Sequence, residues 1–230
     1  MTHDADELER LYAYPATERP WVRTNFVSTL DGGAAGADGK SGSLGGETDT
    51  TVFALLRSLA DVIVVGAGTA RDEGYAHYAV DADLRARLGL SPVPVMAVVS
   101  RRLDIPEPLL VPDNLVVTSA TTDPARLAAL RGSVEVLALG DGEIDWPGVL
   151  AEFADRGWTR ILCEGGPSLH GELIAQDLVD ELCLTIAPIL TAGAAPRIAH
   201  GTHGTDRRME LAHSIEADGG LLTRWVRDRG

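Results

Sequence analysis

The sequence is poor in positive charge, and lysine is almost absent from it. Among its 230 residues, 20 are lysine or arginine and 34 are aspartate or glutamate, which gives a formal net charge of −14. Lys40 is the only lysine. Nucleic acids and anionic membranes are bound through basic patches, so this balance argues against both kinds of partner. An anionic ligand would have to be attracted by local groups, and arginine suits bidentate contacts with phosphate.

Cysteines and long apolar runs are also scarce. The two cysteines, Cys163 and Cys183, stand in apolar, strand-like runs, which favours small buried thiols in a reducing compartment over a disulfide. No apolar run has the length that crossing a bilayer requires, and the acidic stretch 1–10 contains no hydrophobic signal segment. We therefore expect a cytoplasmic protein.

The composition is that of one compact enzyme domain. Hydrophobic residues make up 45% of the chain and charged residues 23%, so a chain of this length can bury a sizeable core. Residues 1–19 are too short and too acidic to form a domain. We interpret them as an N-terminal arm, with packing across a subunit interface as one role, and residues 20–230 as a single domain.

Strand signals alternate with helix signals along the chain. Strands are expected at 21–28, 62–65, 93–99, 115–118, 134–138, 160–163, 181–187 and 221–227, and helices at 48–60, after Thr69, and at 123–130, 147–156 and 167–175. A polar stretch occupies 81–90. This order predicts an α/β fold with a mostly parallel central sheet, flanking helices and an antiparallel C-terminal pair. Periodicity alone leaves flavodoxin-like winding open.

Two glycine turns each follow a predicted strand. Glu164-Gly165-Gly166-Pro167-Ser168 comes after the strand 160–163 and opens a helix, and Gly66-Ala67-Gly68-Thr69 follows the β-branched run 61–65. Glycines let the backbone approach a ligand, and N–H groups of a helix's first turn favour an anion such as a pyrophosphate. Two such turns at the carboxyl ends of strands can hold one dinucleotide. Short strand-to-helix connections are the alternative, and Arg71 breaks the Rossmann fingerprint.

An aspartate stands at the end of the first predicted strand. Asp31 follows Ser28-Thr29-Leu30 and precedes Gly32 and Gly33. In a glycine-rich pocket mouth, partial burial would raise the pKa of this carboxyl group and suit it to orienting a substrate or moving a proton. A turn aspartate that binds its own backbone is the competing interpretation.

Together these stretches resemble one family. Ser-Thr-Leu-Asp-Gly at 28–32, Val-Gly-Ala-Gly-Thr at 65–69 and Glu-Gly-Gly-Pro-Ser at 164–168, followed by Asp180-Glu181-Leu182 and Ala187-Pro188, are similar to the reductase domain of riboflavin biosynthesis. That domain is the C-terminal half of a bifunctional deaminase-reductase and has a dihydrofolate-reductase-like fold. The resemblance spans roughly residues 20–228. The chain lacks the Pro-Cys-x-x-Cys motif that completes the zinc signature of the deaminase half.

The resemblance implies an activity, a cofactor and a set of site residues. NADPH would donate a hydride to C1′ of a phosphoribosylamino-pyrimidine, as in reductases of 5-amino-6-(5-phosphoribosylamino)uracil, and give the ribityl product. Asp31 and Glu164 are the implied catalytic residues, and they bind substrate together with Ser41 and Arg57. The implied cofactor-binding residues are Ser43, Gly66, Gly68, Thr69, Glu73, Ser100, Arg101, Gly165, Gly166, Pro167, Ser168 and Leu169. A homodimer is also expected, with the apolar strand Leu182–Leu190 contributing to its interface.

One departure from the family affects the substrate. Gly33 stands where the family commonly has a lysine after the Asp-Gly pair, and Lys40 lies farther along the loop. A pocket without that lysine could accept another pyrimidine or a pterin-like ring. Dihydrofolate reduction, with Asp31 as proton relay, is therefore a second hypothesis.

Other classes fit less well. Gly166-Pro167-Ser168-Leu169-His170 misses the serine-hydrolase motif at its last position. His200 and His203 lie in a glycine-rich loop with no third metal ligand, so we expect no metal site. His77 follows the second glycine turn, and either a packed surface histidine or one above the active site is compatible with that position. A non-catalytic nucleotide-binding module remains open, although it needs neither Asp31 nor Glu164.

Overall fold

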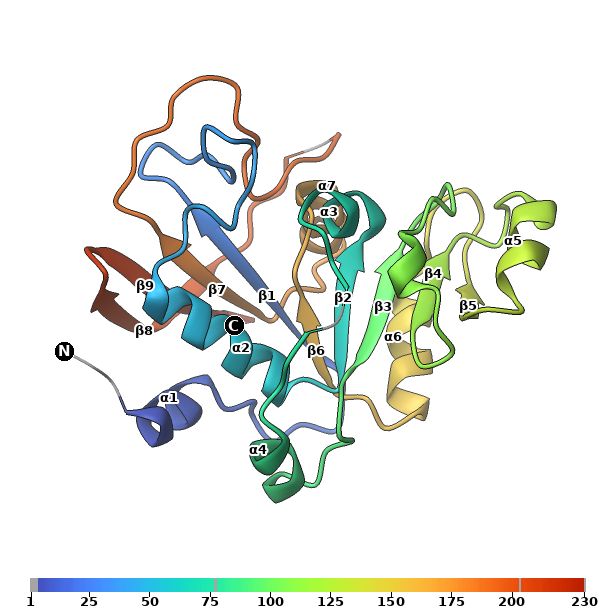
Figure 1. Cartoon of the computed structure of the whole chain (residues 1–230), viewed down its shortest axis with the longest axis horizontal. Coiled ribbons are helices and arrows are strands. Elements are labelled where there is room, and N and C mark those ends of the chain that lie inside the picture. Colours follow the sequence, from blue (N-terminus) through green and yellow to red (C-terminus); the bar gives the residue numbers. More distant parts are fainter. Residues whose placement is uncertain (1–3, 77, 203, 230) are drawn as a thin grey trace.

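A single sheet organises the protein (Figure 1). The computed structural model describes residues 4–76, 78–202 and 204–229. The described strands are β1 Trp21–Ser28, β2 Val62–Gly66, β3 Val95–Val99, β4 Leu115–Thr118, β5 Glu135–Ala138, β6 Arg160–Cys163, β7 Glu181–Ile186, β8 Met209–Ala217 and β9 Gly220–Arg227. They form a 9-stranded sheet in the order β5-β4-β3-β2-β6-β1-β7-β9-β8. Pairings from β5 to β7 are parallel, and β9 pairs antiparallel with β7 and β8.

Helices cover both faces of this sheet. They are α1 Ala5–Tyr12, α2 Glu47–Leu59, α3 Ala67–Asp72, α4 Ala82–Arg87, α5 Pro124–Leu130, α6 Trp146–Asp155 and α7 Pro167–Ala175, with a short 3-10 turn at Glu107–Leu109. Along β2, Ile63 and Val65 join the core under α1, α2 and α4, whereas Val62 and Val64 join the core under α6 and α7. A strand buried on both faces reads as a continuous apolar run, which is why β2 was predictable. The predicted mostly parallel α/β fold with antiparallel C-terminal strands is confirmed.

Three elements were missed by the sequence analysis. β8 pairs with β9, but most of its side chains are exposed or half-buried and its register shifts between Leu211 and His213. Helices α1 and α4 are short, and the carboxylates of the preceding residues, Asp4 and Asp81, cap their N-termini. The predicted polar stretch 81–90 therefore contains a helix.

The N-terminal arm packs on its own chain. Leu8 and Tyr12 of α1 are buried in the core cluster that also contains residues of α2 and the C-terminal hairpin. Beneath the arm, Glu181 is bonded to both Arg23 and Arg224, with N–O distances of 2.6 and 2.7 Å. The Tyr14 ring lies 3.9 Å from the Arg23 guanidinium carbon. The arm therefore packs on its own chain through Leu8 and Tyr12, and a contact of the arm across a subunit interface stays a prediction.

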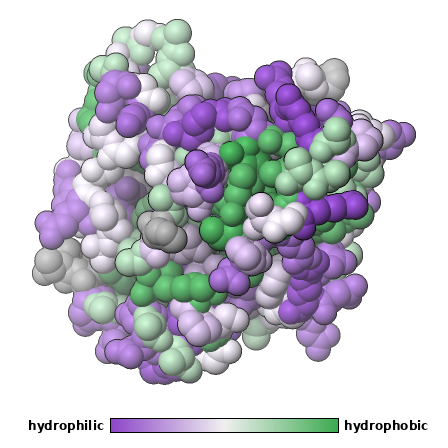
Figure 2. Space-filling model, turned by 45° about the vertical axis from the view of Figure 1, so that its right-hand side comes forward, coloured by the Kyte–Doolittle hydropathy of each residue, from purple (hydrophilic) through white to green (hydrophobic). Residues whose placement is uncertain are grey.

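The two cysteines are buried and free, as predicted. Burial raises the pKa of the Cys163 thiol to about 12, so the thiol stays protonated at neutral pH. Within the described residues, none of the helices combines the length and apolarity needed to cross a membrane. Figure 2 turns the β3 to β5 side of the sheet forward, and there hydrophobic residues gather near the middle among hydrophilic ones.

Candidate active site

Two neighbouring pockets lie at the carboxyl ends of the parallel strands. The first, which we call the glycine pocket, has a volume of about 500 Å³ and is lined by residues that include Gly66, Gly68, Thr69, Ser100, Arg101 and Ser168. The second, the inner pocket, has about 290 Å³ and is lined by residues that include Asn25, Phe26, Asp49, Phe53, Tyr75 and Glu164. Thr69, Gly166 and Pro167 line both, so the two pockets adjoin. Ligands of open α/β sheets bind at this edge.

The two predicted glycine turns are in direct contact. The Gly66 N–H donates to the Gly165 carbonyl at 2.6 Å, and the Gly165-Gly166 peptide is cis. A Cβ atom on Gly166 would collide with the Thr69 hydroxyl oxygen, and one on Gly165 would stand 2.9 Å from the Phe26 ring. Only glycine allows these backbones to lie so close.

The glycine pocket has donors suited to a dinucleotide. No side chain caps α7, so N–H groups of its first turn, at Ser168 and Leu169, have no partner within the helix. Hydroxyl groups of Thr69, Ser100 and Ser168 stand around the same pocket, and Pro167 and Leu169 line its wall. The exposed Arg101 lies at the pocket and is 3.3 Å from Glu172. This donor set fits a pyrophosphate and an additional phosphate group. Gly165, which was also predicted to bind the cofactor, lines neither the glycine pocket nor the inner pocket.

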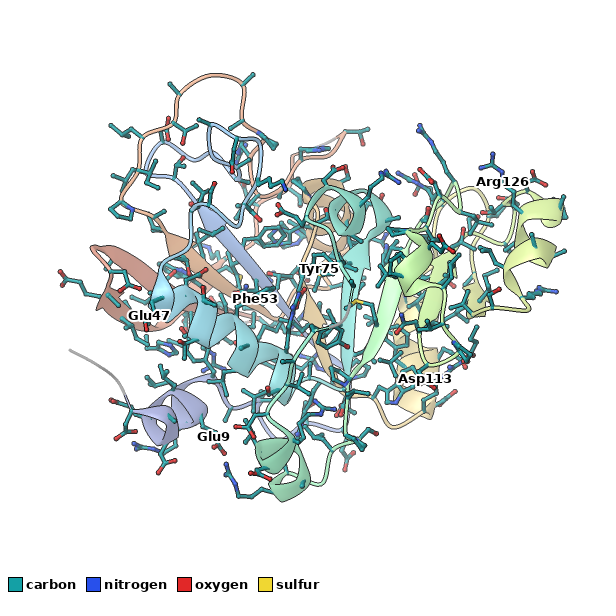
Figure 3. The ribbon with its side chains drawn as sticks, in the orientation of Figure 1. Glu9, Glu47, Phe53, Tyr75, Asp113 and Arg126 are labelled. Carbon is teal, nitrogen blue, oxygen red and sulfur yellow. The ribbon has the colours of Figure 1, made fainter. Side chains whose placement is uncertain are left out.

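A buried ion pair joins the inner pocket to α2. Arg57 donates from Nε and Nη2 to the two carboxylate oxygens of Glu164, both at 2.7 Å, and the Tyr75 hydroxyl donates to Glu164 at 2.6 Å. The Arg57 guanidinium lies 4.1 Å from the Phe53 ring centre. The Tyr75 ring centre lies 5.3 Å from the same guanidinium, and Figure 3 labels Phe53 on α2 and Tyr75 beyond α3. Burial alone would lower the pKa of Arg57, but the bonds and charge of Glu164 raise it, so the guanidinium stays charged.

The structure therefore brings together Glu164 and Arg57, which the sequence analysis assigned separately. Their side chains come from β6–α7 and α2, and they are 107 positions apart. The Arg57 guanidinium also interacts with the Tyr75 side chain, so two residues of the inner pocket hold it in place. Arg57 lines a further cavity beside the inner pocket, together with Ser41 and Glu73.

Ser41 and Ser43 lie in the loop between β1 and α2, and Glu73 follows α3. Glu73 accepts hydrogen bonds from the Ser41 N–H at 2.9 Å and hydroxyl at 2.8 Å, so it anchors the loop beside the inner pocket. Ser43 donates to Asp38 at 2.9 Å. Ser43 and Lys40 line neither the glycine pocket nor the inner pocket.

Asp31 differs from its prediction. Its carboxylate is exposed and accepts bonds from the Thr29 hydroxyl at 2.6 Å and from the N–H groups of Thr191 and Ala192. The bonds from Thr29, Ala192 and Thr191 lower the pKa of Asp31 to about 2. The expectation that burial raises this pKa is wrong. Asp31 lines neither pocket, and its geometry links two loops instead of supporting a proton relay.

The sequence analysis missed Asp49. This half-buried residue in the first turn of α2 lines the inner pocket and accepts a hydrogen bond from the Thr185 hydroxyl of β7 at 2.5 Å. Burial raises the pKa of its carboxyl group. Asp49, Phe53 and Arg57 are spaced four apart, which places them on one face of a helix. This spacing is the feature of the sequence from which Asp49 could have been predicted as a site residue.

A buried histidine supports the opposite side of the turn. His170 of α7 stacks on Phe26 with ring centres 4.3 Å apart, and its Nδ1 is 3.0 Å from the Ile198 carbonyl. Burial lowers the pKa of His170 from 6.5 to about 4. In the unfolded chain the ring gains a proton near pH 6.5, whereas in the folded protein it does so only near pH 4. Stability supplied by the neutral ring is therefore present above pH 6.5 and lost as the pH falls through 4.

We expect this loss to amount to roughly 3 kcal/mol between about pH 6.5 and 4, from the size of the shift. Urea unfolding at several pH values, compared with His170→Asn, measures it. The variant should be less stable at neutral pH and show a shallower decline over that interval. Parallel declines in both proteins would contradict the assignment.

Three histidines bear on the metal hypothesis. His77 and His203 lie outside the described residues. His200 is exposed, with Nε2 3.3 Å from the Ser168 hydroxyl. Among the described residues, no group of three or more His, Cys, Asp or Glu side chains is arranged to hold a metal ion.

The fold has known structural relatives. A pyrimidine reductase-like protein from Corynebacterium diphtheriae superposes with a TM-score of 0.86 at 27% identity, covering 97% of this chain and 99% of the other. Dihydrofolate reductase from Enterococcus faecalis superposes with a TM-score of 0.50 at 12% identity, covering 90% and 96%. The second likeness concerns the fold alone, and it confirms the predicted dihydrofolate-reductase-like architecture.

Sequence comparison identifies the family. The 2,5-diamino-6-ribosylamino-4(3H)-pyrimidinone 5′-phosphate reductase of Methanothermobacter thermautotrophicus is 30% identical over 219 residues, which cover 90% of this chain and 98% of the relative. Residues 20–223 match the family described as the RibD C-terminal domain. The chain is thus homologous to the reductases of riboflavin biosynthesis and belongs to the RibD C-terminal domain family.

Proposed function

We propose that this protein is an NADPH-dependent reductase that converts the ribosyl group of a phosphoribosylamino-pyrimidine to a ribityl group in riboflavin biosynthesis. The carrying observation is that the glycine pocket adjoins the inner pocket at Thr69, Gly166 and Pro167. A cofactor in one pocket would thereby meet a ring and sugar in the other. The resemblance gave the uracil form of the substrate, and the archaeal relative is named for the 2,5-diamino form.

The glycine pocket is the proposed cofactor site. Bound NADPH would supply a hydride, and the chain's part is to hold and orient it. Backbone at Gly66, Gly68 and Gly166 would admit the pyrophosphate, and the Thr69 and Ser168 hydroxyls would bond it. Ser100 and Arg101, beyond β3, would meet the 2′-phosphate. Arg101 is suited to this because its surface pair with Glu172 exchanges easily with solvent and ligands.

The inner pocket is the proposed substrate site. Arg57, which lines the cavity beside this pocket, would bind the substrate phosphate. Glu164, oriented by Arg57, would accept hydrogen bonds from sugar hydroxyls and stabilise the positive charge that develops near C1′. Glu73 would act by anchoring Ser41 beside this pocket.

One experiment tests the function. NADPH absorbance is followed with purified protein and the ribosylaminopyrimidine phosphate, and calorimetry measures NADPH binding alone. Oxidation of NADPH that requires the pyrimidine supports the proposal. Binding without oxidation by any candidate substrate would instead indicate a non-catalytic nucleotide-binding module.

Dihydrofolate is a second candidate substrate. The inner pocket holds Asp49, whose carboxylate can accept from adjacent N–H groups of a pterin ring, and Gly33 replaces the family lysine. Dihydrofolate-dependent oxidation of NADPH tests this candidate.

A cytoplasmic location stays a prediction.

We also propose a homodimer. In β7, Leu182, Leu184 and Ile186 are half-buried on the face opposite the buried Cys183, and Leu190 beyond the strand is 74% exposed. Apolar surface of this kind is typical of subunit interfaces. We expect light scattering to give twice the chain mass of 24.3 kDa at micromolar concentration. A mass equal to one chain would contradict this.

A further inference from the structure

Asp49 lines the inner pocket, and only one of its two carboxylate oxygens accepts a hydrogen bond from the described residues. Its Oδ1 accepts from Thr185 at 2.5 Å, and among the described residues no donor is bonded to Oδ2. Gly45 lies against Oδ2 so closely that a Cβ on it would collide with that oxygen. The carboxylate is therefore fixed in position by β7 and the loop, in the wall of the cavity.

The surroundings of Asp49 suit a flat heterocycle. Phe26, Val27 and Phe53 line the same cavity, and Asn25 adds an amide. The other carboxylates at the pocket are engaged or peripheral, since Glu164 is paired with Arg57, Glu73 is bonded to Ser41, and Asp72 is exposed. Asp49 is the acid left to meet the ring.

An ionised carboxylate only accepts hydrogen bonds, so it selects for neighbouring donors. The 2,5-diamino-4(3H)-pyrimidinone ring presents an amino group at C2 beside an N–H at N3. A uracil ring has the same N3–H, but carbonyl oxygens flank it on both sides. A carboxylate facing that edge would make one bond and oppose a carbonyl oxygen.

We propose that Asp49 selects the substrate by its 2-amino, N3–H edge, so that this chain reduces the 2,5-diamino-pyrimidinone ribosyl phosphate in preference to its 5-amino-uracil counterpart. The inference rests on the proposed function and names the ring on which that function acts. Thr185 is a positioning residue, because it touches Asp49 and holds its orientation.

The charge of Asp49 gives a second readout. Groups that face it from the packed elements are Thr185 on β7, Asp218 at the β8–β9 turn, and the Arg57–Glu164 pair farther along the pocket. Burial and Asp218 raise the pKa of Asp49, and Thr185 opposes them. Activity with the diamino ring should therefore fall on the acid side above the ordinary aspartate value of 3.8.

The test compares kcat/KM for the two ring forms in the full-length protein with NADPH. We expect a preference of at least about 100-fold for the diamino ring, because a site built to bond an N–H strongly rejects an analogue that lacks it. Asp49→Asn offers one acceptor and one donor, which matches the N3–H and carbonyl of uracil. This variant should lose most of the preference for the diamino ring or reverse it. The fall of its activity at acid pH should also disappear.

Glu47→Gln is the matched control. Glu47 is exposed in the same first turn of α2 (Figure 3), so the variant removes the same charge outside the pocket and should keep the wild-type preference. Thermal melting checks the fold, and Asp49→Asn should melt at or above the wild-type temperature because a partly desolvated charge is removed.

Equal or better turnover of the uracil form by the wild type would overturn the inference, as would an unchanged preference in Asp49→Asn. If neither ring supports NADPH oxidation, the proposed function fails. Calorimetry of the two rings with the NADP⁺-loaded protein then decides the inference separately. Tighter binding of the diamino ring that Asp49→Asn abolishes supports it, and equal binding overturns it.

Discussion

Gly166→Ala should weaken NADPH binding by roughly 100-fold, because the added methyl group cannot fit without separating the two glycine turns. A Cβ at this position collides with the Thr69 hydroxyl, and the Gly166 N atom lies only 3.4 Å from where a Cβ on Gly66 would stand. Movement of the β6–α7 turn would displace the donors of α7 from the pyrophosphate. Calorimetric titration with NADPH measures the loss.

Two further variants separate blockage of the site from misfolding. Gly132→Ala adds the same methyl group in a connection where no atom lies within 4 Å, so its affinity for NADPH should be unchanged. Gly68 lines the glycine pocket and a Cβ there also meets nothing within 4 Å, so Gly68→Leu should fold normally and still exclude the cofactor. Wild-type affinity in both Gly166→Ala and Gly68→Leu would refute the proposed cofactor site.

Arg57→Met should destabilise the protein by about 3–5 kcal/mol, because it leaves the Glu164 carboxylate buried without its partner. The Glu164 side chain is 1% exposed and that of Arg57 15%, so solvent screens the pair little. The same change should lower kcat/KM by at least about 100-fold, since the orientation of Glu164 and a phosphate ligand are both lost. Urea unfolding and steady-state kinetics measure the two effects.

The control for this change is Arg156→Met. Arg156 pairs with Glu135 and Glu152 at 2.7 Å on the surface, where such pairs contribute at most about 1 kcal/mol. In the double variant Arg57→Met/Glu164→Leu, stability should recover relative to Arg57→Met because no charge is left buried, while activity should stay lost. Full activity in that double variant would exclude a substrate role for the pair.

Local signals were sufficient for most of the sheet. The β-branched run before Gly66 and the apolar run before Glu164 predicted β2, β6 and the glycine turn that follows each, since burial on both faces removes polar residues from such strands. β8 was missed because its exposed edge position leaves polar residues on it. The helix 167–175 was placed correctly because Gly166 and Pro167 mark its start.

The site was less predictable, because its geometry depends on pairings between distant segments. Arg57 and Glu164 were each assigned a ligand, but their mutual bond joins positions 107 apart. Asp31 was expected to be partly buried, and its actual partners Thr191 and Ala192 are 160 and 161 positions away. Asp49 contacts Thr185 across 136 positions, so only its spacing with Phe53 and Arg57 was visible in the sequence.

The cluster of Arg23, Glu181 and Arg224 beneath the N-terminal arm bears on where this protein can be shortened. The family match begins at residue 20, yet Tyr14 covers the Arg23 guanidinium and the Leu11 carbonyl accepts from Arg224. A fragment cut at the match boundary would lose these contacts and open the Arg23–Glu181 pair, whose two side chains are both 0% exposed in the intact chain, to solvent. We therefore expect recombinant fragments that retain α1 to be more stable than fragments cut at residue 20.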